Sequence, residues 1–220
     1  MNKKIRLLIF ISGLFFLLVF YLFSREVKRG FLKETDFAVT VKIQDRMSAR
    51  FDEFWDDTAF FVSPGPSIFL VGLLTIAALV DWKNKKIRLR ALVIPLLFGA
   101  LVLGEIYGKS VVHHPAPPFF MIKNPTTIFP KYYINDQFSY PSGHTARAVF
   151  LGITLFALFA GPVAGWMKRK KKMLILAGSV ILYIAAVAVG RIYLGHHWLS
   201  DIIGGGLLGL AAGLGVVFLL

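Results

Sequence analysis

The sequence Gly190-Arg-Ile-Tyr-Leu-Gly-His-His-Trp-Leu-Ser-Asp201 lies between two long apolar segments of the chain. It brings one arginine, two histidines and one aspartate into a chain that is otherwise mostly apolar. Ionisable groups at a membrane boundary are costly to place and tend to mark function. If a helix begins after Trp198, His197 and Asp201 lie at positions i and i+4 on one face, close enough for the carboxylate to orient the ring. The stretch therefore predicts a helical membrane protein with a catalytic histidine.

The composition also indicates a membrane protein. The chain of 220 residues is 56% hydrophobic, well above the roughly 45–50% of a soluble domain. It has no cysteine, which excludes disulfides, thiolate nucleophiles and cysteine-based zinc sites. The net charge of +13 does not indicate nucleic acid, because the basic residues cluster in short loops between apolar segments, as membrane topology and anionic phospholipids require. We expect one integral membrane domain, residues 1–220, and no nucleic-acid partner; no sequence feature decides an oligomeric state.

Six apolar segments are interpreted as membrane helices. They cover about residues 5–23, 67–80, 91–107, 143–161, 173–189 and 199–220. Because the connections between most of them are short, the sequence predicts an all-α fold, a bundle of six transmembrane helices. The first segment follows basic residues as a signal peptide does, but small residues suited to cleavage are missing after it, so we expect a retained span.

The segment from Ser24 to Ala59 is polar, with seven Lys or Arg and eight Asp or Glu. Its apolar residues recur at roughly helical spacing and are Phe37, Val41, Met47, Phe51, Phe54 and Trp55. This pattern suits an amphipathic helix that lies along the membrane interface after the first span. A solvated helical loop explains it equally well.

The basic segments predict the orientation in the membrane. The N-terminus and the loops at 83–90 and 168–172 carry basic excess, so we expect them in the cytoplasm. Six spans then return the C-terminus to the cytoplasm. The same arrangement brings the segments 109–141 and 190–198 together on the outer face, where we expect the site.

A second polar cluster, Tyr140-Pro-Ser-Gly-His-Thr145, stands at the entry to the fourth span. Ser142 is suited to cap that helix, and the free N–H groups of a helix start form a ready anion site. His144 then projects from the first turn beside this site. Lys109 follows the third span on the same face. Glu105 is interpreted as a boundary carboxylate paired with Lys109 at i+4 in preference to an intramembrane functional acid.

Together these groups favour metal-free phosphoryl transfer. Cations and oriented N–H groups hold a phosphate and stabilise the charge that develops as it transfers. One histidine can attack phosphorus while the other protonates the departing oxygen. The alternative is a metal site built from His144, His197 and Asp201. It leaves the nearby Lys and Arg residues unexplained, since cations disfavour a metal.

The motifs resemble those of the type 2 phosphatidic acid phosphatase (PAP2) superfamily of membrane lipid phosphatases over roughly residues 60–220. The family's Pro-Ser-Gly-His motif is intact at 141–144. Its third motif is present as Arg191, five residues, His197, three residues, Asp201, with Gly190 where the family usually has Ser. Its first motif, Lys, six residues, Arg-Pro, is partial, because Lys109 leads to Ala116-Pro117.

The resemblance implies a role for each matching residue. His197 would be the nucleophile, Asp201 its orienting carboxylate, and His144 the acid that protonates the leaving group. The residues that would bind the phosphate are Lys109, Ser142, Gly143 and Arg191. No metal and no cofactor are implied.

The alanine at position 116 removes one cation from this set. Losing one Arg contact to a dianion costs a few kcal/mol of transition-state stabilisation. Arg147, three residues after His144, is a candidate replacement; it is equally suited to snorkel to the interface or to pair with Asp136. His113 and His114 are weaker substitutes.

By the resemblance, the substrate would be a lipid phosphate or diphosphate: undecaprenyl diphosphate, phosphatidylglycerol phosphate or phosphatidic acid. The compact form is typical of a bacterial plasma-membrane protein. Two alternatives share the same motifs. One is a phosphotransferase that passes the phosphoryl group to a second lipid. The other is a non-catalytic protein that binds or carries a lipid phosphate.

Overall fold

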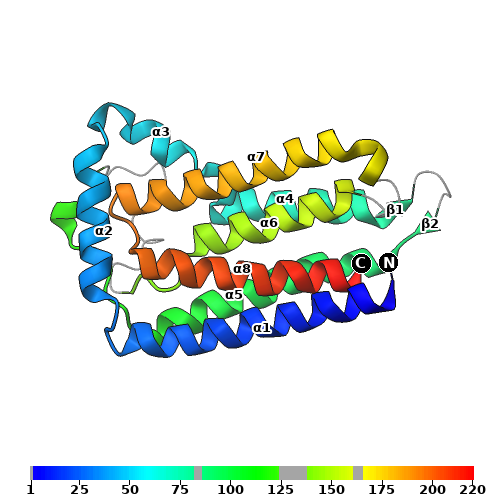
Figure 1. Cartoon of the computed structure of the whole chain (residues 1–220), viewed down its shortest axis with the longest axis horizontal. Coiled ribbons are helices and arrows are strands. Elements are labelled where there is room, and N and C mark those ends of the chain that lie inside the picture. Colours follow the sequence, from blue (N-terminus) through cyan, green and yellow to red (C-terminus); the bar gives the residue numbers. More distant parts are fainter. Residues whose placement is uncertain (1, 82–85, 124–137, 161–165) are drawn as a thin grey trace.

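A computed structural model of the chain describes residues 2–81, 86–123, 138–160 and 166–220. The longest described elements are helices that run side by side along the molecule (Figure 1). They are α1 (Lys3–Lys28), α4 (Pro64–Leu79), α5 (Val93–Val112), α6 (Gly143–Ala160), α7 (Trp166–Tyr193) and α8 (Leu199–Leu219). Both chain termini lie at one end of this bundle, and the starts of α6 and α8 lie at the other end.

The remaining elements are short. Two further α helices follow α1, namely α2 (Lys33–Arg46) and α3 (Asp52–Asp57). Strands β1 (Val80–Asp81) and β2 (Lys86–Ile87) pair antiparallel, with Val80 opposite Ile87. Single 3-10 turns cover Ala49–Phe51, Phe60–Val62, Leu89–Leu92 and Phe119–Met121.

The helices have the length and composition of membrane spans. Within the described residues, four segments are long and apolar enough to cross a membrane: Lys3–Lys28, Leu89–Val112, Lys170–Tyr193 and Leu199–Leu219. Two shorter apolar helices, Pro64–Leu79 and Gly143–Phe159, accompany them. Large apolar side chains are exposed along the outer helices, for example Leu182 of α7, which suits contact with lipid rather than water. The prediction of an all-α, multi-pass membrane protein is confirmed.

Helix α8 forms the centre of the bundle. It packs against α1, α5 and α6, while α7 covers the other side of α6. Two glycines allow the closest approach: a Cβ on Gly204 would overlap the ring of Tyr140, and one on Gly205 would overlap the carbonyl oxygen of Ser142. The start of α6 is therefore held directly against α8 because these positions have no side chain.

Helix α7 ends later than the sequence indicates. It runs through Tyr193, so Gly190 and Arg191 are helical and the loop begins at Leu194. Gly195 then ends the helix in the left-handed conformation, with φ of 72°, and the His196 N–H donates to the Arg191 carbonyl at 3.0 Å. This is the glycine-terminated helix end known as a Schellman motif. The predicted loop at 190–198 is thus shorter, and Arg191 is fixed on a helix.

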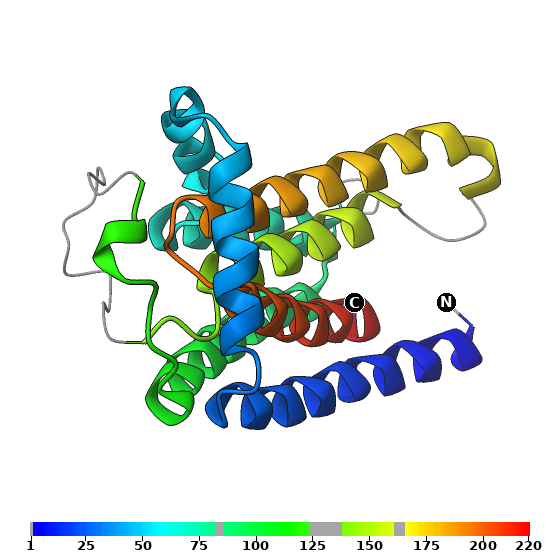
Figure 2. The same cartoon turned by 60° about the vertical axis from the view of Figure 1, so that its left-hand side comes forward.

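Helix α2 lies across one end of the bundle, where it packs against the end of α7 and the start of α8 (Figures 1 and 2). It buries polar residues, Asp36 and Thr40, against the bundle, whereas Phe37 is 53% exposed. The side chain of Gln44 donates to the carbonyl oxygens of Met121 at 2.7 Å and Tyr193 at 2.8 Å. The apolar pattern in this segment therefore does not mark the face that packs on the protein.

Candidate active site

The two histidines of the intact motifs lie together at the end of the bundle that α2 covers. His144 stands on the first turn of α6, and His197 lies two residues before the start of α8 at Leu199. Their ring centroids are 6.4 Å apart, at an interplanar angle of 62°. The Ser142 N–H donates to the Asp201 carbonyl oxygen at 2.9 Å, so the starts of the two helices are joined directly. The sequence prediction that these two motifs meet is confirmed.

Asp201 lies behind His197. Its Oδ2 atom is 3.4 Å from His197 Nδ1 and accepts a hydrogen bond from the Trp198 N–H at 2.9 Å. The second contact is a helix-capping bond, which fixes the carboxylate at the start of α8. His197 Nδ1 has no hydrogen bond among the described residues. Catalytic hydrogen bonds of this kind are often long before substrate binds.

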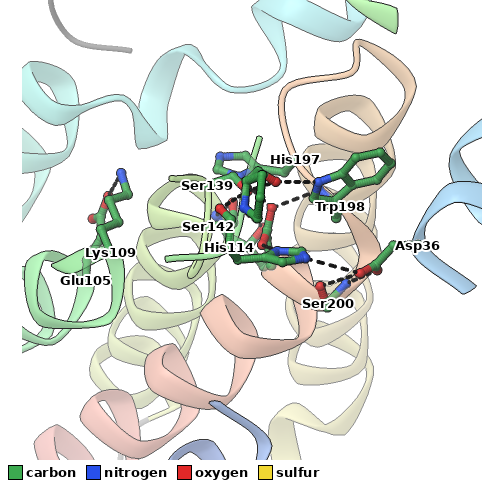
Figure 3. Close-up of polar contacts among 12 residues, drawn as sticks. Asp36, Glu105, Lys109, His114, Ser139, Ser142, His197, Trp198 and Ser200 are labelled. Atoms are coloured by element: carbon green, nitrogen blue, oxygen red, sulfur yellow. Dashed lines mark hydrogen bonds and ion pairs between the residues drawn. The ribbon is translucent and has the colours of Figure 1, made fainter. Parts of the chain in front are cut away.

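The other oxygen of Asp201 has a partner that the sequence did not single out for this role. His114 Nδ1 lies 2.9 Å from Asp201 Oδ1. His114 follows α5 and is 6% exposed, whereas His113 is exposed and has a φ of 54°. The candidate cation His114 is therefore bound to the carboxylate of the site (Figure 3).

A second aspartate, Asp36 of α2, extends the same cluster. Its two oxygens accept hydrogen bonds from the N–H and the hydroxyl of Ser200, both at 2.8 Å, and Oδ2 is 3.8 Å from His114 Nε2. Burial raises the pKa of Asp36 above its ordinary value, while the bonds from Ser200 favour the charged form. Sequence reasoning missed Asp36, because nothing near it in the chain distinguishes it from the other charges of its segment.

Arg191 is buried, being 4% exposed, and is held by the segment around α3. Its Nη2 atom bonds to Asp56 Oδ1 at 2.8 Å and to the Trp55 carbonyl oxygen at 3.2 Å. Nη1 lies 3.0 Å from His196 Nδ1. The Nε–H is buried and has no hydrogen-bond partner among the described residues. This donor is therefore available for a further hydrogen bond.

Lys109 and Arg147 both form ion pairs with the carboxylate of Glu105. Glu105 Oε1 is 3.0 Å from Lys109 Nζ, and Oε2 is 2.7 Å from Arg147 Nη1. The predicted Glu105–Lys109 pair is confirmed. The predicted partner of Arg147, Asp136, lies outside the described residues; the observed partners are Glu105 and the Val62 carbonyl oxygen, at 2.7 Å from Nε.

The predicted anion site at the start of α6 has the expected local structure. The Ser142 hydroxyl accepts from the Thr145 N–H at 3.4 Å, which is a helix cap. The Glu105 carboxylate lies against Gly143, where a Cβ would overlap it. The carboxylate, the two cations bound to it and the helix start therefore form one cluster beside His144.

No described group of three or more His, Asp or Glu residues has an arrangement suited to a metal ion. This applies to the ranges 2–81, 86–123, 138–160 and 166–220.

Comparison with known proteins agrees with this geometry. The family model described as the PAP2 superfamily matches residues 88–219. The chain belongs to the PAP2 superfamily. Among curated PAP2 relatives, phosphatidylglycerophosphatase B of Bacillus subtilis is 36% identical over 75 residues, 34% of this chain and 36% of the relative. The undecaprenyl-diphosphatase of Sulfolobus acidocaldarius is 35% identical over 137 residues, 62% of this chain and 56% of the relative. The matches thus span about a third to a half of those relatives.

Two solved structures share the fold over most of this chain. The PAP2 type phosphatidylglycerolphosphate phosphatase from Bacillus subtilis superimposes with a TM-score of 0.70 at 21% identity, covering 93% of each chain. Aquifex aeolicus LpxE gives a TM-score of 0.59 at 20% identity, over 83% of this chain and 94% of that one. At these identities the likeness establishes the fold.

Proposed function

We propose that this chain is an enzyme that removes phosphate from a membrane lipid phosphate or diphosphate, with His197 as the nucleophile and without a metal. The observation that carries the proposal is the facing pair of rings, His144 and His197, at 6.4 Å between centroids, with Asp201 behind His197. The names of the PAP2 relatives, a phosphatidylglycerophosphatase and an undecaprenyl-diphosphatase, support the same class of reaction.

The reaction takes two steps. In the first, neutral His197 attacks phosphorus through Nε2, because Nδ1 faces Asp201. The nitrogen–phosphorus bond forms, the bond to the leaving oxygen breaks, and protonated His144 gives that oxygen its proton. In the second, His144 takes a proton from water, the water oxygen attacks phosphorus, and the nitrogen–phosphorus bond breaks. Inorganic phosphate leaves and His197 is free again.

The phosphate oxygens are bound by cations and N–H groups. We assign this role to Lys109, Arg191 and the helix start at Ser142 and Gly143. The buried Nε–H of Arg191, which has no hydrogen-bond partner among the described residues, supports its part, since this donor remains available to an anion. Asp56 keeps the guanidinium in place.

We also assign Arg147 to the phosphate site, as the cation that replaces the one missing at Ala116. The support is its position: Glu105 holds the Arg147 guanidinium and the Lys109 ammonium on its two oxygens, beside Gly143. One carboxylate compensates only one of the two positive charges. The remaining charge suits a phosphate dianion.

We propose that six helices cross the membrane, with α4 and α6 as the two shorter spans. At 16 and 18 residues they are about 24 and 27 Å long, close to the ~30 Å hydrocarbon core. The end of the bundle with the chain termini would be cytoplasmic and would contact anionic phospholipids. The end with His144 and His197 would face outside. The exposed aromatic residues near α2 and α3 would lie at the outer interface; they are Phe31, Phe37, Phe51 and Phe54.

For the substrate, we favour a prenyl diphosphate or phosphatidylglycerol phosphate, ahead of phosphatidic acid. The support is the names of the two curated relatives, a phosphatidylglycerophosphatase and an undecaprenyl-diphosphatase. The test is phosphate release from each of the three lipids by the purified protein in vesicles. We expect at least one to be hydrolysed, and the His197→Ala variant to lose at least about 1,000-fold in rate.

The matched control for this experiment is His113→Asn. His113 is exposed, and Asn tolerates its left-handed backbone, so the variant should keep full activity. Phosphate release by His197→Ala at the normal rate would exclude the nucleophile. Lipid-phosphate binding without release by the native chain would favour a carrier, and transfer of phosphate to an added acceptor lipid would favour a phosphotransferase.

A further inference from the structure

His114 lies between two carboxylates at the centre of the site. Its Nδ1 is 2.9 Å from Asp201 Oδ1, and its Nε2 is 3.8 Å from Asp36 Oδ2 (Figure 3). A carboxylate only accepts hydrogen bonds, so the Nδ1 nitrogen carries the proton and donates it to Asp201. The backbone of His114 is fixed as well, because its carbonyl oxygen accepts from the Ser139 N–H at 2.9 Å.

His114 contacts only one of the two carboxylate oxygens of Asp201. Oδ1 accepts from His114, whereas Oδ2 accepts from the Trp198 N–H and faces His197 Nδ1 at 3.4 Å. Both oxygens are therefore fixed, and the plane of the carboxylate is set by residues on both sides of it. Asp201 is fully buried, so water does not compete for these contacts.

Asp36 attaches helix α2 to the same row of groups. It is held by Ser200, the residue directly before Asp201. The row Asp36, His114, Asp201, His197 thus joins α2, the segment after α5, and the start of α8. The charged and titratable groups that face His114 in the described residues are Asp201 from α8 and Asp36 from α2, with His197 beyond Asp201.

We propose that His114 is a positioning residue that holds Asp201 so that Oδ2 orients and polarises His197, and that Asp36 holds the far side of the His114 ring. This inference rests on the proposed function, since it assigns His114 a part in the activation of the same nucleophile. His114 itself does not touch the phosphate. Its effect passes through the hydrogen bond from Nδ1 to Asp201.

Loss of the hydrogen bond from His114 to Asp201 should change the pH profile of kcat/KM. Donation from His114 draws charge from the Asp201 carboxylate. Without it, Asp201 attracts the proton on His197 more strongly, and His197 stays protonated, and inactive, to higher pH. The acid limb of the pH profile of kcat/KM should therefore move to higher pH by about half a unit or more.

Two variants of similar chemistry separate this role from packing. In His114→Asn the side-chain amide nitrogen takes the place of Nδ1 and still donates to Asp201. In His114→Gln the amide nitrogen takes the place of Nε2 and faces Asp36. We expect His114→Gln to lose about 10-fold or more in kcat with little change in KM, and to move the acid limb upward. His114→Asn should stay within about threefold of the native chain, with the limb unmoved.

The experiment also includes His113→Asn as the control that should stay active and His197→Ala as the control that should be inactive. Melting temperatures show whether each variant folds. Equal loss in His114→Asn and His114→Gln, with the acid limb unmoved in both, would show that His114 only fills space and would overturn the inference. If His114→Gln does not fold, His114→Asn alone tests the inference. This variant must keep the activity and the acid limb of the native chain, and loss of either would overturn the inference. Persistent activity in His197→Ala would instead overturn the proposed function, so the two failures are distinguishable.

Discussion

At the scale of single residues, the site supplies its positive charges from side chains and a helix start. Arg191 has a buried Nε–H without a partner in the described part of the chain, and Lys109 is the partly exposed member of its pair, with 27% of its side chain exposed. In the proposed reaction these groups would compensate the charge of the phosphate.

We therefore expect chelators to leave the activity unchanged. Phosphate release measured with and without EDTA should agree within about twofold, because no step of the proposed mechanism uses a Lewis acid. Vanadate, which mimics five-coordinate phosphorus, should inhibit. Loss of most activity with EDTA, restored by a divalent cation, would contradict the proposed reaction.

At the scale of elements, two contacts hold the helices that carry the histidines. The first is the ion pair between Glu105 of α5 and Arg147 of α6, at 2.7 Å. Both residues are buried, at 9% and 5% exposed. Removing Arg147 leaves the Glu105 carboxylate with Lys109 as its remaining counter-charge, so the cost should stay below about 3–5 kcal/mol, the cost of a buried pair left without any compensation.

The ion pair between Glu105 and Arg147 allows a test of whether Arg147 binds the phosphate. Arg147→Gln should lose both stability and activity. The double variant Glu105→Gln/Arg147→Gln removes both charges, so part of the stability should return. Because Lys109 also loses its carboxylate partner in this variant, its activity is compared with that of Glu105→Gln alone. If Arg147 binds phosphate, kcat/KM of the double variant is at least about 10-fold below that of Glu105→Gln. Equal kcat/KM in these two variants would show that Arg147 serves only to pair with Glu105.

The second contact is the glycine face of α8. A Cβ on Gly205 would overlap the Ser142 carbonyl oxygen, whereas one on the next residue, Gly206, would meet nothing within 4 Å. Gly205→Ala should push α6 away from α8 and separate His144 from His197, at a cost of about 1–3 kcal/mol in stability.

Gly206→Ala is the matched control, and it should be neutral or stabilising because alanine favours the helix by up to about 1 kcal/mol. Thermal unfolding and phosphate release of the two variants check this expectation. Equal behaviour of both variants would mean that the close approach of α8 to α6 is not needed for the site.

At the scale of the whole molecule, the termini and β2 lie at one end of the bundle and the histidine cluster at the other (Figure 1). The chain has no cysteine, so single cysteines can report which end faces outward. Ile87 of β2 is 74% exposed, and Phe120, in the 3-10 turn Phe119–Met121, is 82% exposed.

We expect a membrane-impermeant maleimide to label Phe120→Cys in intact cells and to label Ile87→Cys only after the membrane is opened. The basic residues near the termini give the reason, because basic segments stay in the cytoplasm. Labelling of Ile87→Cys in intact cells, with Phe120→Cys protected, would reverse the proposed orientation.

The long apolar helices and the two histidine motifs could be predicted from the amino-acid sequence. Apolar runs of membrane length predict spans wherever they occur, because the bilayer requires both a length and an apolar surface. The helix starts beside Ser142 and after Trp198 were predictable from short motifs, whereas the end of α7 at Tyr193 was not. The pairings Glu105–Lys109 and His197–Asp201 were predictable because each spans four residues.

The tertiary structure alone decided how these motifs are supported. His114 reaches Asp201 from 87 residues away, Asp36 reaches Ser200 from 164, and Asp56 reaches Arg191 from 135. No periodicity or local spacing connects such residues, since their proximity depends on how α2, α3 and α5 fold over the starts of α6 and α8. The sequence named the residues expected to react, and the packing of distant segments decided which groups hold them in place.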